Sequence, residues 1–248
     1  MLPEVCKKFW NDSFIDPFDK TDQQKGAQAP LAEIPFDETA LISLPDPKKL
    51  KFCSFDLSEF IENRRTIRKY ADKSISLDEL SFLLWATQGL TKSMSDERSL
   101  RTVPSAGARH AFETVILVNK VNGLKRGIYR YIVSQHKLLP LNFTNDKIED
   151  LISGFRNINL VANSAVTFLW IAVPERMTWK FNARGYRYLL LDAGHICQNL
   201  YLAAEAVECG CCGIGAFDDE EVIATLKLNE NEYFLTYAAS VGKKTNNE

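Results

Sequence analysis

A long helix is the first element that the sequence predicts. Residues 184–207 read RGYRYLLLDAGHICQNLYLAAEAV, and from Tyr188 to Val207 apolar residues occur on almost every side. This pattern is typical of a central helix that other elements cover on most sides. Gly210 stands where it can cap the helix. Gly194, in mid-helix, costs up to about 1 kcal/mol relative to alanine, which close helix packing, for example across a dimer axis, would explain.

Two polar residues of this predicted helix are candidates for a buried contact. Asp192 and His195 lie three residues apart, on the same side of a helix. The two side chains could contact each other, or each could form hydrogen bonds with a separate polar group of the core.

Shorter elements surround the long helix in the sequence. Ser76-Leu-Asp-Glu79 is a capping-box pattern that begins a helix, and Gly89 can end that helix in a left-handed conformation. Because helices and strands mix without a strict βαβ rhythm, the fold class is expected to be α+β. The other predicted helices span 56–64 and 218–226, and the predicted strands span 115–119, 128–133, 165–173 and 233–241.

The first 55 residues differ in composition from the rest. They hold six of the nine prolines and one glycine, Gly26. Proline removes backbone donors and fixes φ, so this segment is expected to run extended over a surface rather than to build a sheet. The predicted organisation is therefore a proline-rich N-terminal arm, residues 1–55, and one domain, residues 56–248.

Composition restricts the class of partner. The net charge of -2, from 30 basic and 32 acidic residues, provides no basic face for nucleic acid. No stretch approaches the roughly 18 uninterrupted apolar residues of a membrane span, and the N-terminus MLPEVCKKFWNDSF lacks the pattern of a signal peptide. We therefore expect a cytoplasmic protein without nucleic-acid or membrane partners.

The six cysteines do not predict a metal site. The cluster Cys209-Gly-Cys211-Cys212 matches no standard zinc spacing, and the chain has only three histidines. The favoured interpretation is a set of small, reduced, apolar residues packed near a helix end.

A basic segment offers a possible oxyanion site. Residues 64–70 read RRTIRKY, and every side chain except that of Ile67 can donate hydrogen bonds to an oxyanion. One guanidinium group can donate two parallel hydrogen bonds to two oxygens of a phosphate, so three arginines and a hydroxyl could bind a phosphate from several sides. The alternative is a solvated basic helix end, which the helix dipole favours.

Two runs of small residues could approach a flat ligand. Thr102 to His110 reads TVPSAGARH, in which Gly107 permits positive φ, although an ordinary tight turn is an equal alternative. Residues 212–217 read CGIGAF and follow the long helix. The chain contains neither the dinucleotide fingerprint GxGxxG after a strand nor the P-loop pattern.

In this order the three segments resemble the nitroreductase superfamily. Residues 64–68 resemble its R-x-S-x-R/K motif, which binds the FMN phosphate, and residues 104–107 resemble the loop against the isoalloxazine ring. Residues 214–217 resemble the segment whose amides reach flavin N5 and O4. The resemblance runs over roughly residues 56–243, and the stretches SLDELSFLLWATQGLT, RTVPSAGARHAFE and GIYRY look like the SagB-type dehydrogenase branch.

The resemblance implies a fold, a cofactor and a set of ligands. The fold would be a central mixed five-stranded sheet flanked by helices, and FMN would lie between the two subunits of a homodimer. NAD(P)H or an oxidisable organic substrate would exchange hydride at flavin N5. The residues that would hold FMN are Arg64, Arg65, Thr66, Arg68, Pro104, Ser105, Ala106, Gly107, Ile214, Gly215, Ala216 and Lys243.

The chain departs from the family pattern at its catalytic candidate. Many members carry a Lys-Tyr pair before the R-G-Y-R-Y stretch, but this chain has Lys180-Phe181. Lys180 is still the candidate base for a proton that leaves with hydride, whereas the alternative is an exposed strand-end lysine in a loop that borders the pocket. Ala111 also replaces a usual proline, and only Lys243 and Lys244 provide basic groups near the C-terminus.

The expected function is an FMN-dependent oxidoreductase of the SagB type that acts on a small molecule or a peptide heterocycle. Two alternatives stay open. The chain could be an NAD(P)H-dependent nitro or quinone reductase, or a flavoprotein subunit that is inactive without a partner and docks through its arm.

Overall fold

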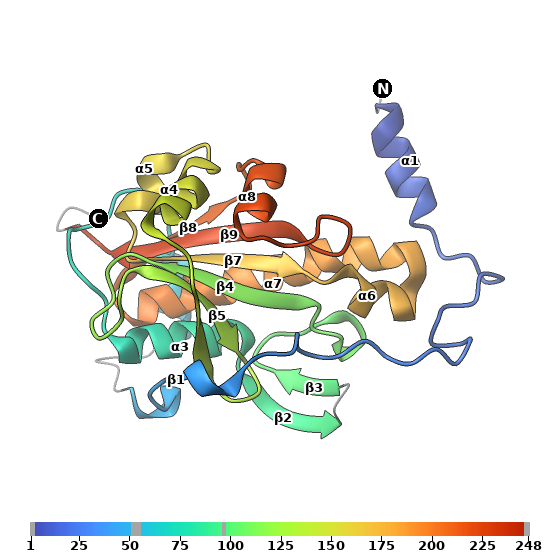
Figure 1. Ribbon diagram of the computed structural model, residues 1–248, viewed down its shortest axis with the longest axis horizontal. Helices are drawn as coiled ribbons and strands as arrows, with labels where there is room; N and C mark the ends of the chain where they lie inside the picture. Colours follow the sequence, from blue (N-terminus) through green and yellow to red (C-terminus); the bar gives the residue numbers. More distant parts are fainter. Residues whose placement is uncertain (1–2, 51–55, 96–97, 246–248) are drawn as a thin grey trace.

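A broad antiparallel sheet organises the protein (Figure 1). The computed structural model describes residues 3–50, 56–95 and 98–245. These residues form a seven-stranded sheet in the order β1-β6-β5-β4-β7-β9-β8 and a separate hairpin of β2 and β3. The strands are β1 (Ile42–Ser43), β2 (Leu90–Ser95), β3 (Arg98–Arg101), β4 (Phe112–Val118), β5 (Gly127–Ile132), β6 (Lys137–Leu141), β7 (Val166–Ala172), β8 (Cys209–Ile214) and β9 (Phe234–Lys243).

The α+β class is confirmed, but the sheet differs from the expected one. It has seven strands instead of five, and the ladders between its strands are antiparallel instead of mixed. One reason is the arm, which adds the edge strand β1 beside β6 although its prolines predicted no sheet. A two-residue strand at an edge needs few backbone donors, so a proline-rich segment can supply it.

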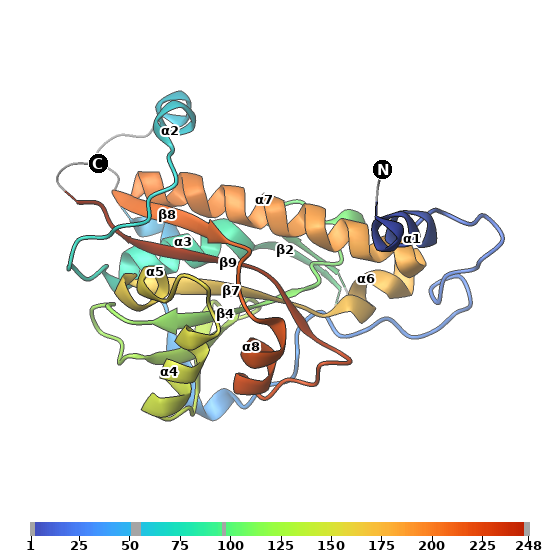
Figure 2. The ribbon, with the colours of Figure 1, turned by 90° about the horizontal axis from the view of Figure 1, so that it is seen from above.

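Helices cover both faces of the sheet (Figure 2). Alternate side chains of β4 point to opposite faces, so Ile116 packs in the core cluster with α3, α6 and α7, and Leu117 in the cluster with α4, α5 and α8. The α-helices are α1 (Glu4–Asp12), α2 (Leu57–Asn63), α3 (Leu77–Gln88), α4 (Asn145–Ser153), α5 (Ile158–Asn163), α6 (Pro174–Phe181), α7 (Gly185–Ala206) and α8 (Asp219–Thr225). None of the described helices is both long and apolar enough to span a membrane.

The predicted caps are confirmed, whereas the two glycine caps are wrong. Asp56 caps α2, and Ser76 with Glu79 forms the capping box of α3. Gly89 has φ of -57°, so it does not end α3 in a left-handed conformation. Gly210 lies within strand β8, where a Cβ would stand 2.6 Å from the Cβ of Ile67. Both glycines are needed for close approach, because a side chain at Gly89 would collide with Trp85.

The long helix is confirmed as α7, but one of its faces is open. Leu190 and Leu191 are 55% and 59% exposed, and Gly194 has open space around its Cα. His195 is on this exposed face, whereas Asp192 is buried. A fully buried contact between these two side chains is therefore not formed, because His195 lies on the exposed side of the helix, although its charge still acts on Asp192. The other alternative holds for Asp192, which accepts from a backbone N–H of the core.

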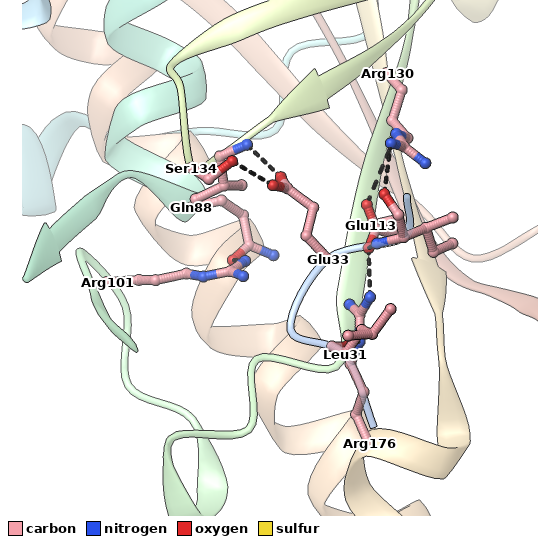
Figure 3. A network of polar contacts seen from close by, with 10 residues as sticks. Leu31, Glu33, Gln88, Arg101, Glu113, Arg130, Ser134 and Arg176 are labelled. Carbon is pink, nitrogen blue, oxygen red and sulfur yellow. Dashed lines mark hydrogen bonds and ion pairs between the residues drawn. The ribbon is translucent and has the colours of Figure 1, made fainter. Parts of the chain in front are cut away.

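The arm is anchored to the sheet by a buried charge network (Figure 3). Glu113 on β4 accepts from Arg176 Nη2 at 2.6 Å and from the backbone N–H of Ile34 at 3.0 Å. Arg176 Nε donates to the carbonyl of Leu31 at 2.7 Å, and Arg130 Nη2 donates to that of Ile34 at 2.8 Å. Three buried charged side chains of the domain thus hold the backbone of the arm.

Candidate functional site

The basic segment runs beside the edge strand β8. After α2 ends, Thr66 forms a bridge with Cys211, and the backbone N–H of Ile67 donates to the carbonyl of Cys211 at 3.0 Å. Ile67 is buried, whereas Arg65 and Arg68 are exposed. In the described part of the chain, no carboxylate forms an ion pair with Arg64, Arg65 or Arg68. This distinguishes them from the buried arginines of the arm network.

A tyrosine of α7 joins the basic segment to the third segment. The hydroxyl of Tyr201 lies 3.2 Å from Thr66 Oγ1 and accepts from the backbone N–H of Gly213 at 2.8 Å. The guanidinium of Arg64 lies over the Tyr201 ring, 5.2 Å from its centre. Burial raises the pKa of Tyr201, so its phenol stays protonated at neutral pH. Sequence reasoning missed Tyr201, because it counted only as one more apolar residue of the helix.

The third segment leaves β8 and is held at its far end, where the carbonyl of Ala216 accepts from the backbone N–H of Arg156 at 3.1 Å. Ile214 is buried, but Gly215 and Ala216 are exposed, and a Cβ added to Gly215 would meet nothing within 4 Å. The two segments along β8 therefore present exposed backbone and three arginines that lack a carboxylate partner among the described residues, although Arg65 donates to the carbonyls of Glu62 and Arg64. This arrangement suits an anionic ligand with a flat polar body.

The loop of residues 104–107 packs on a different part of the molecule. Gly107 has φ of +59°, and a Cβ there would stand 2.9 Å from Phe181 Cζ and 3.0 Å from Lys180 Nζ. The backbone N–H of Ala106 donates to Asp192 Oδ1 at 3.3 Å. Burial raises the pKa of Asp192 above its usual value, although this hydrogen bond opposes the shift. Both reasons for a glycine, positive φ and close approach, apply at Gly107.

The structure brings two of the three segments together and leaves the third apart. The anchors of the two groups on α7, Asp192 and Tyr201, are nine residues apart, or about 14 Å along a helix axis. Among the described residues, no hydrogen bond joins the loop 104–107 to residues 64–68 or 214–216. Pro104 is exposed, and Ser105 accepts from the backbone N–H of His110 at 2.9 Å. Burial lowers the pKa of His110 to about 3.

Lys180 lies in the last turn of α6, so the expected strand-end position in a loop is wrong. Its side chain is half-buried, and its Nζ lies 5.7 Å from the centre of the Phe181 ring. Both residues line a cavity of about 720 Å³ between the arm and the start of α7. The catalytic candidate and the small-residue loop are thus neighbours.

Lys243 has a partner within the chain. Its Nζ donates to Glu79 Oε1 at 2.6 Å and to the carbonyl of Val207 at 2.9 Å, and Lys244 pairs with Glu205. Its assignment as a phosphate ligand stays a prediction. To bind a phosphate, the Lys243 amine would have to give up its hydrogen bond to Glu79.

The cysteine cluster is part of the sheet core. Cys209, Cys211 and Cys212 lie in β8 and are buried, and Cys197 is buried on α7. Burial raises the pKa of Cys209 to about 12, so the thiol is protonated and unreactive at neutral pH. The cysteines of β8 thus pack just after the end of α7, as predicted, and they do so within an edge strand of the sheet.

Comparison with known proteins places this geometry in a family. The family model described as the nitroreductase family matches residues 61–243. A protein of Methanocaldococcus jannaschii that is named for the nitroreductases is 33% identical over 207 residues, which cover 84% of this chain and 98% of that protein. A crystal structure from Ralstonia eutropha, also named for the nitroreductases, has a TM-score of 0.68 and 21% identity, over 83% of this chain and 90% of that one.

Two further solved structures share the fold. A protein of Desulfovibrio desulfuricans in complex with FMN has a TM-score of 0.53 and 19% identity, over 78% of this chain and 89% of that one. A chain of the Escherichia coli microcin synthetase McbBCD complex has a TM-score of 0.61 and 18% identity, over 96% of this chain and 87% of that one. At these identities the likeness shows the fold alone. By the family model and the 33% identical relative, the chain belongs to the nitroreductase family.

Proposed function

We propose that the protein is an FMN-dependent oxidoreductase. The observation that carries the proposal is the set of Arg64, Arg65 and Arg68, which have no carboxylate partner among the described residues. Their segment runs beside β8 at Cys211, and β8 leads into the exposed backbone of Gly215. Unpaired arginines beside accessible amides fit a terminal phosphate on a flat polar ring. Membership of the nitroreductase family and the FMN-bound relative from Desulfovibrio desulfuricans support the same cofactor.

Each of the three segments has a part in this proposal. Arg64, Arg65, Thr66 and Arg68 would bind the phosphate and place positive charge near the ring, with Lys243 as a further candidate. The backbone of Ile214, Gly215 and Ala216 would orient the ring edge. When bound, FMN supplies hydride transfer at N5. Pro104, Ser105, Ala106 and Gly107 would cover one ring face.

The dimer is part of the same proposal. Because loop 104–107 is anchored about 14 Å along α7 from Tyr201, one chain alone offers two separate halves of a site. The open face of α7 at Leu190, Leu191 and Gly194 is apolar. A twofold axis near Gly194 would set the loop of one subunit beside the arginines of the other and would bury this face.

Lys180 is the proposed base. We infer a SagB-type reaction in which a small molecule or a peptide heterocycle loses hydride to the cofactor and a proton to the Lys180 amine. With a peptide thiazoline as substrate, Lys180→Ala should abolish oxidation and leave reduction of the bound flavin by dithionite unchanged. Phe181→Tyr should keep or raise the rate. Normal turnover by Lys180→Ala would move the proton transfer to another group.

The cofactor assignment is tested by reconstitution. Flavin-free protein is titrated with FMN and with FAD, and binding is followed by quenching of flavin fluorescence. FMN should bind more tightly, because the arginines suit a terminal dianionic phosphate and the chain has no dinucleotide fingerprint. Tighter binding of FAD, or binding of neither flavin, would contradict the proposal.

A second candidate function is a flavoprotein subunit that works only with a partner. The observation that favours it is the apolar surface of the arm, where Val5 and Trp10 on α1 are 74% and 54% exposed. The chain from the microcin synthetase complex also matches over 96% of this chain. Rapid oxidation of NAD(P)H by the isolated protein would instead favour a nitro or quinone reductase, whereas bound FMN without turnover would favour the subunit.

A further inference from the structure

The cavity beside Lys180 has the size of a small-molecule site. Its volume of about 720 Å³ lies within the range of roughly 300–1,000 Å³ that is typical of ligand pockets. One wall consists of α6, the turn after it and the start of α7, which contribute Lys180, Phe181, Arg184 and Tyr188. The opposite wall is the arm between Asn11 and Gln24.

The arm wall is held in place by specific bonds. Arg187 Nε donates to Ser13 Oγ at 2.5 Å, and Asn182 Nδ2 donates to Asp19 Oδ2 at 2.8 Å. Trp179 Nε1 donates to the carbonyl of Ala27 at 3.0 Å, just beyond the wall. Ser13 is 2% exposed, so this anchor is withdrawn from water. The segment is thus a built wall of the cavity rather than a loop that passes over it.

The two walls present aromatic rings to the same space. Phe14 and Phe18 of the arm are 57% and 92% exposed, so more than half of the surface of each is accessible, although the Arg187 guanidinium lies over part of the Phe14 ring. Across the cavity, the rings of Phe181 and Tyr188 meet edge to face with centres 4.9 Å apart. Apolar rings on both sides favour a flat aromatic ligand.

The charges of the cavity favour an anion. Lys180 and Arg184 are half-buried, and no carboxylate in the described ranges pairs with either of them. Arg184 Nη1 donates to the carbonyl of Ser13 at 3.4 Å, its guanidinium carbon lies 5.6 Å from the centre of the Tyr188 ring, and its Nε has no hydrogen-bond partner among the described residues. A guanidinium that is partly withdrawn from water and lacks a counter-ion is costly, and a ligand carboxylate would relieve that cost.

The carboxylates of the cavity already have partners and lie in water. Asp12 pairs with Lys8, Asp16 accepts from the backbone N–H of Phe18 at 2.8 Å, and Asp19 accepts from Asn182. All three are exposed. Solvent and salt therefore screen their repulsion of an anionic ligand more strongly than they screen its attraction to the two half-buried cations.

We propose that this cavity is the substrate pocket of the enzyme and that it takes a flat aromatic carboxylate. Phe14 and Tyr188 would contact the ring system, and the Arg184 guanidinium would bind the carboxylate. Lys180 and the neighbouring Gly107 would border the reacting end. The inference rests on the proposed function only for the identity of this reacting end, because binding to the cavity requires no redox step.

The first test compares three probes of one shape. Naphthoate, naphthylmethanol and naphthylmethylammonium carry the same ring and differ in charge. Isothermal titration calorimetry on the protein as purified should show that naphthoate binds at least about tenfold more tightly than the alcohol, because a charge-assisted contact contributes roughly that factor or more. The ammonium should bind most weakly. Equal binding of all three probes, or tighter binding of the ammonium, would overturn the assignment.

The second test locates the probe in the cavity. Arg184→Gln should weaken the binding of naphthoate by about tenfold or more and leave the binding of naphthylmethanol unchanged. Arg184→Lys should restore part of the lost affinity for naphthoate. Phe14→Ala should weaken all three probes alike. Arg126→Gln, at an exposed arginine that pairs with Glu149, is the matched control and should change nothing. Naphthoate binding that is unaffected by Arg184→Gln would overturn the proposal.

The two proposals fail in distinguishable ways. The absorbance of the purified protein reports the flavin, whereas calorimetry with naphthoate reports the cavity. Loss of the flavin assignment would leave the probe ranking and the Arg184 effect intact. If the protein carries flavin but binds the three probes in another order of affinity, the pocket assignment is wrong and the flavin assignment stands. The ranking in the unmodified protein also stands if a variant fails to fold.

Discussion

At the scale of single residues, the account depends on arginines that have no counter-ion within the chain. Arg64→Ala and Arg68→Ala should each weaken FMN binding by about tenfold to a hundredfold, because a charge-assisted contact contributes roughly 1.5–3 kcal/mol. The unfolding temperature of the flavin-free protein should change little in Arg68→Ala, since Arg68 is exposed and no ion pair is lost. In Arg64→Ala it should fall slightly, since the contact with the Tyr201 ring is worth about 0.5–1 kcal/mol. Fluorescence titration with FMN measures the effect.

The control for this prediction is another exposed arginine. Arg126→Ala removes the same group from the pair with Glu149, on a surface remote from β8 in the strand order. FMN affinity should stay at the wild-type value in this variant. If Arg64→Ala and Arg68→Ala also kept that value, the basic segment would be the solvated helix end that its charge alone allows.

At the scale of elements, Asp192 ties the loop 104–107 to α7. Because burial raises the pKa of Asp192 above its usual 3.8, the folded chain keeps this proton to higher pH than the unfolded chain does. The wild type should therefore lose stability relative to Asp192→Asn as the pH rises from about 3.8 through the raised pKa, and the difference should then level off. Thermal unfolding of both proteins over this pH range checks the sign. A difference that shrinks with rising pH would contradict it.

The arm network provides a second prediction at this scale. Glu113→Ala leaves the buried Arg176 guanidinium without its carboxylate and frees the backbone N–H of Ile34. Loss of one partner of a buried pair costs about 3–5 kcal/mol, so urea unfolding should show a decrease of that order, and hydrogen exchange should rise in residues 27–34. Glu149→Ala, at an exposed pair, should cost at most about 1 kcal/mol. Equal losses in both variants would contradict the role of the network.

Sequence patterns predicted the elements better than their contacts. The capping box at Ser76 and the strand predicted over 115–119 follow from local chemistry, and both are confirmed, the strand as β4. At Gly89 and Gly210 the pattern could not separate the two uses of glycine, positive φ and close approach, because the partners Trp85 and Ile67 become neighbours only in the folded chain. The same limit applies to Tyr201 and Arg184, whose partners lie far away in the sequence.

At the scale of the whole molecule, the open face of α7 is the proposed subunit interface. Leu191→Glu places a charge on a face that the dimer would bury, so sedimentation should show a monomer, and this monomer should lose FMN because its site is divided between subunits. Ile158→Glu is the matched control, since Ile158 on α5 is 49% exposed and lies on the opposite side of the sheet. A flavin-loaded monomer at micromolar concentration would contradict the interface.

The central claim is that this chain carries FMN and uses it for electron transfer. The most direct test is the absorbance spectrum of the purified protein, recorded before and after addition of NADH, NADPH and a peptide thiazoline, followed by chromatography of the released flavin. The account predicts a flavin spectrum that bleaches with at least one of these donors and a released flavin that is FMN. A protein that carries FAD, or that binds no flavin after incubation with FMN, would contradict it.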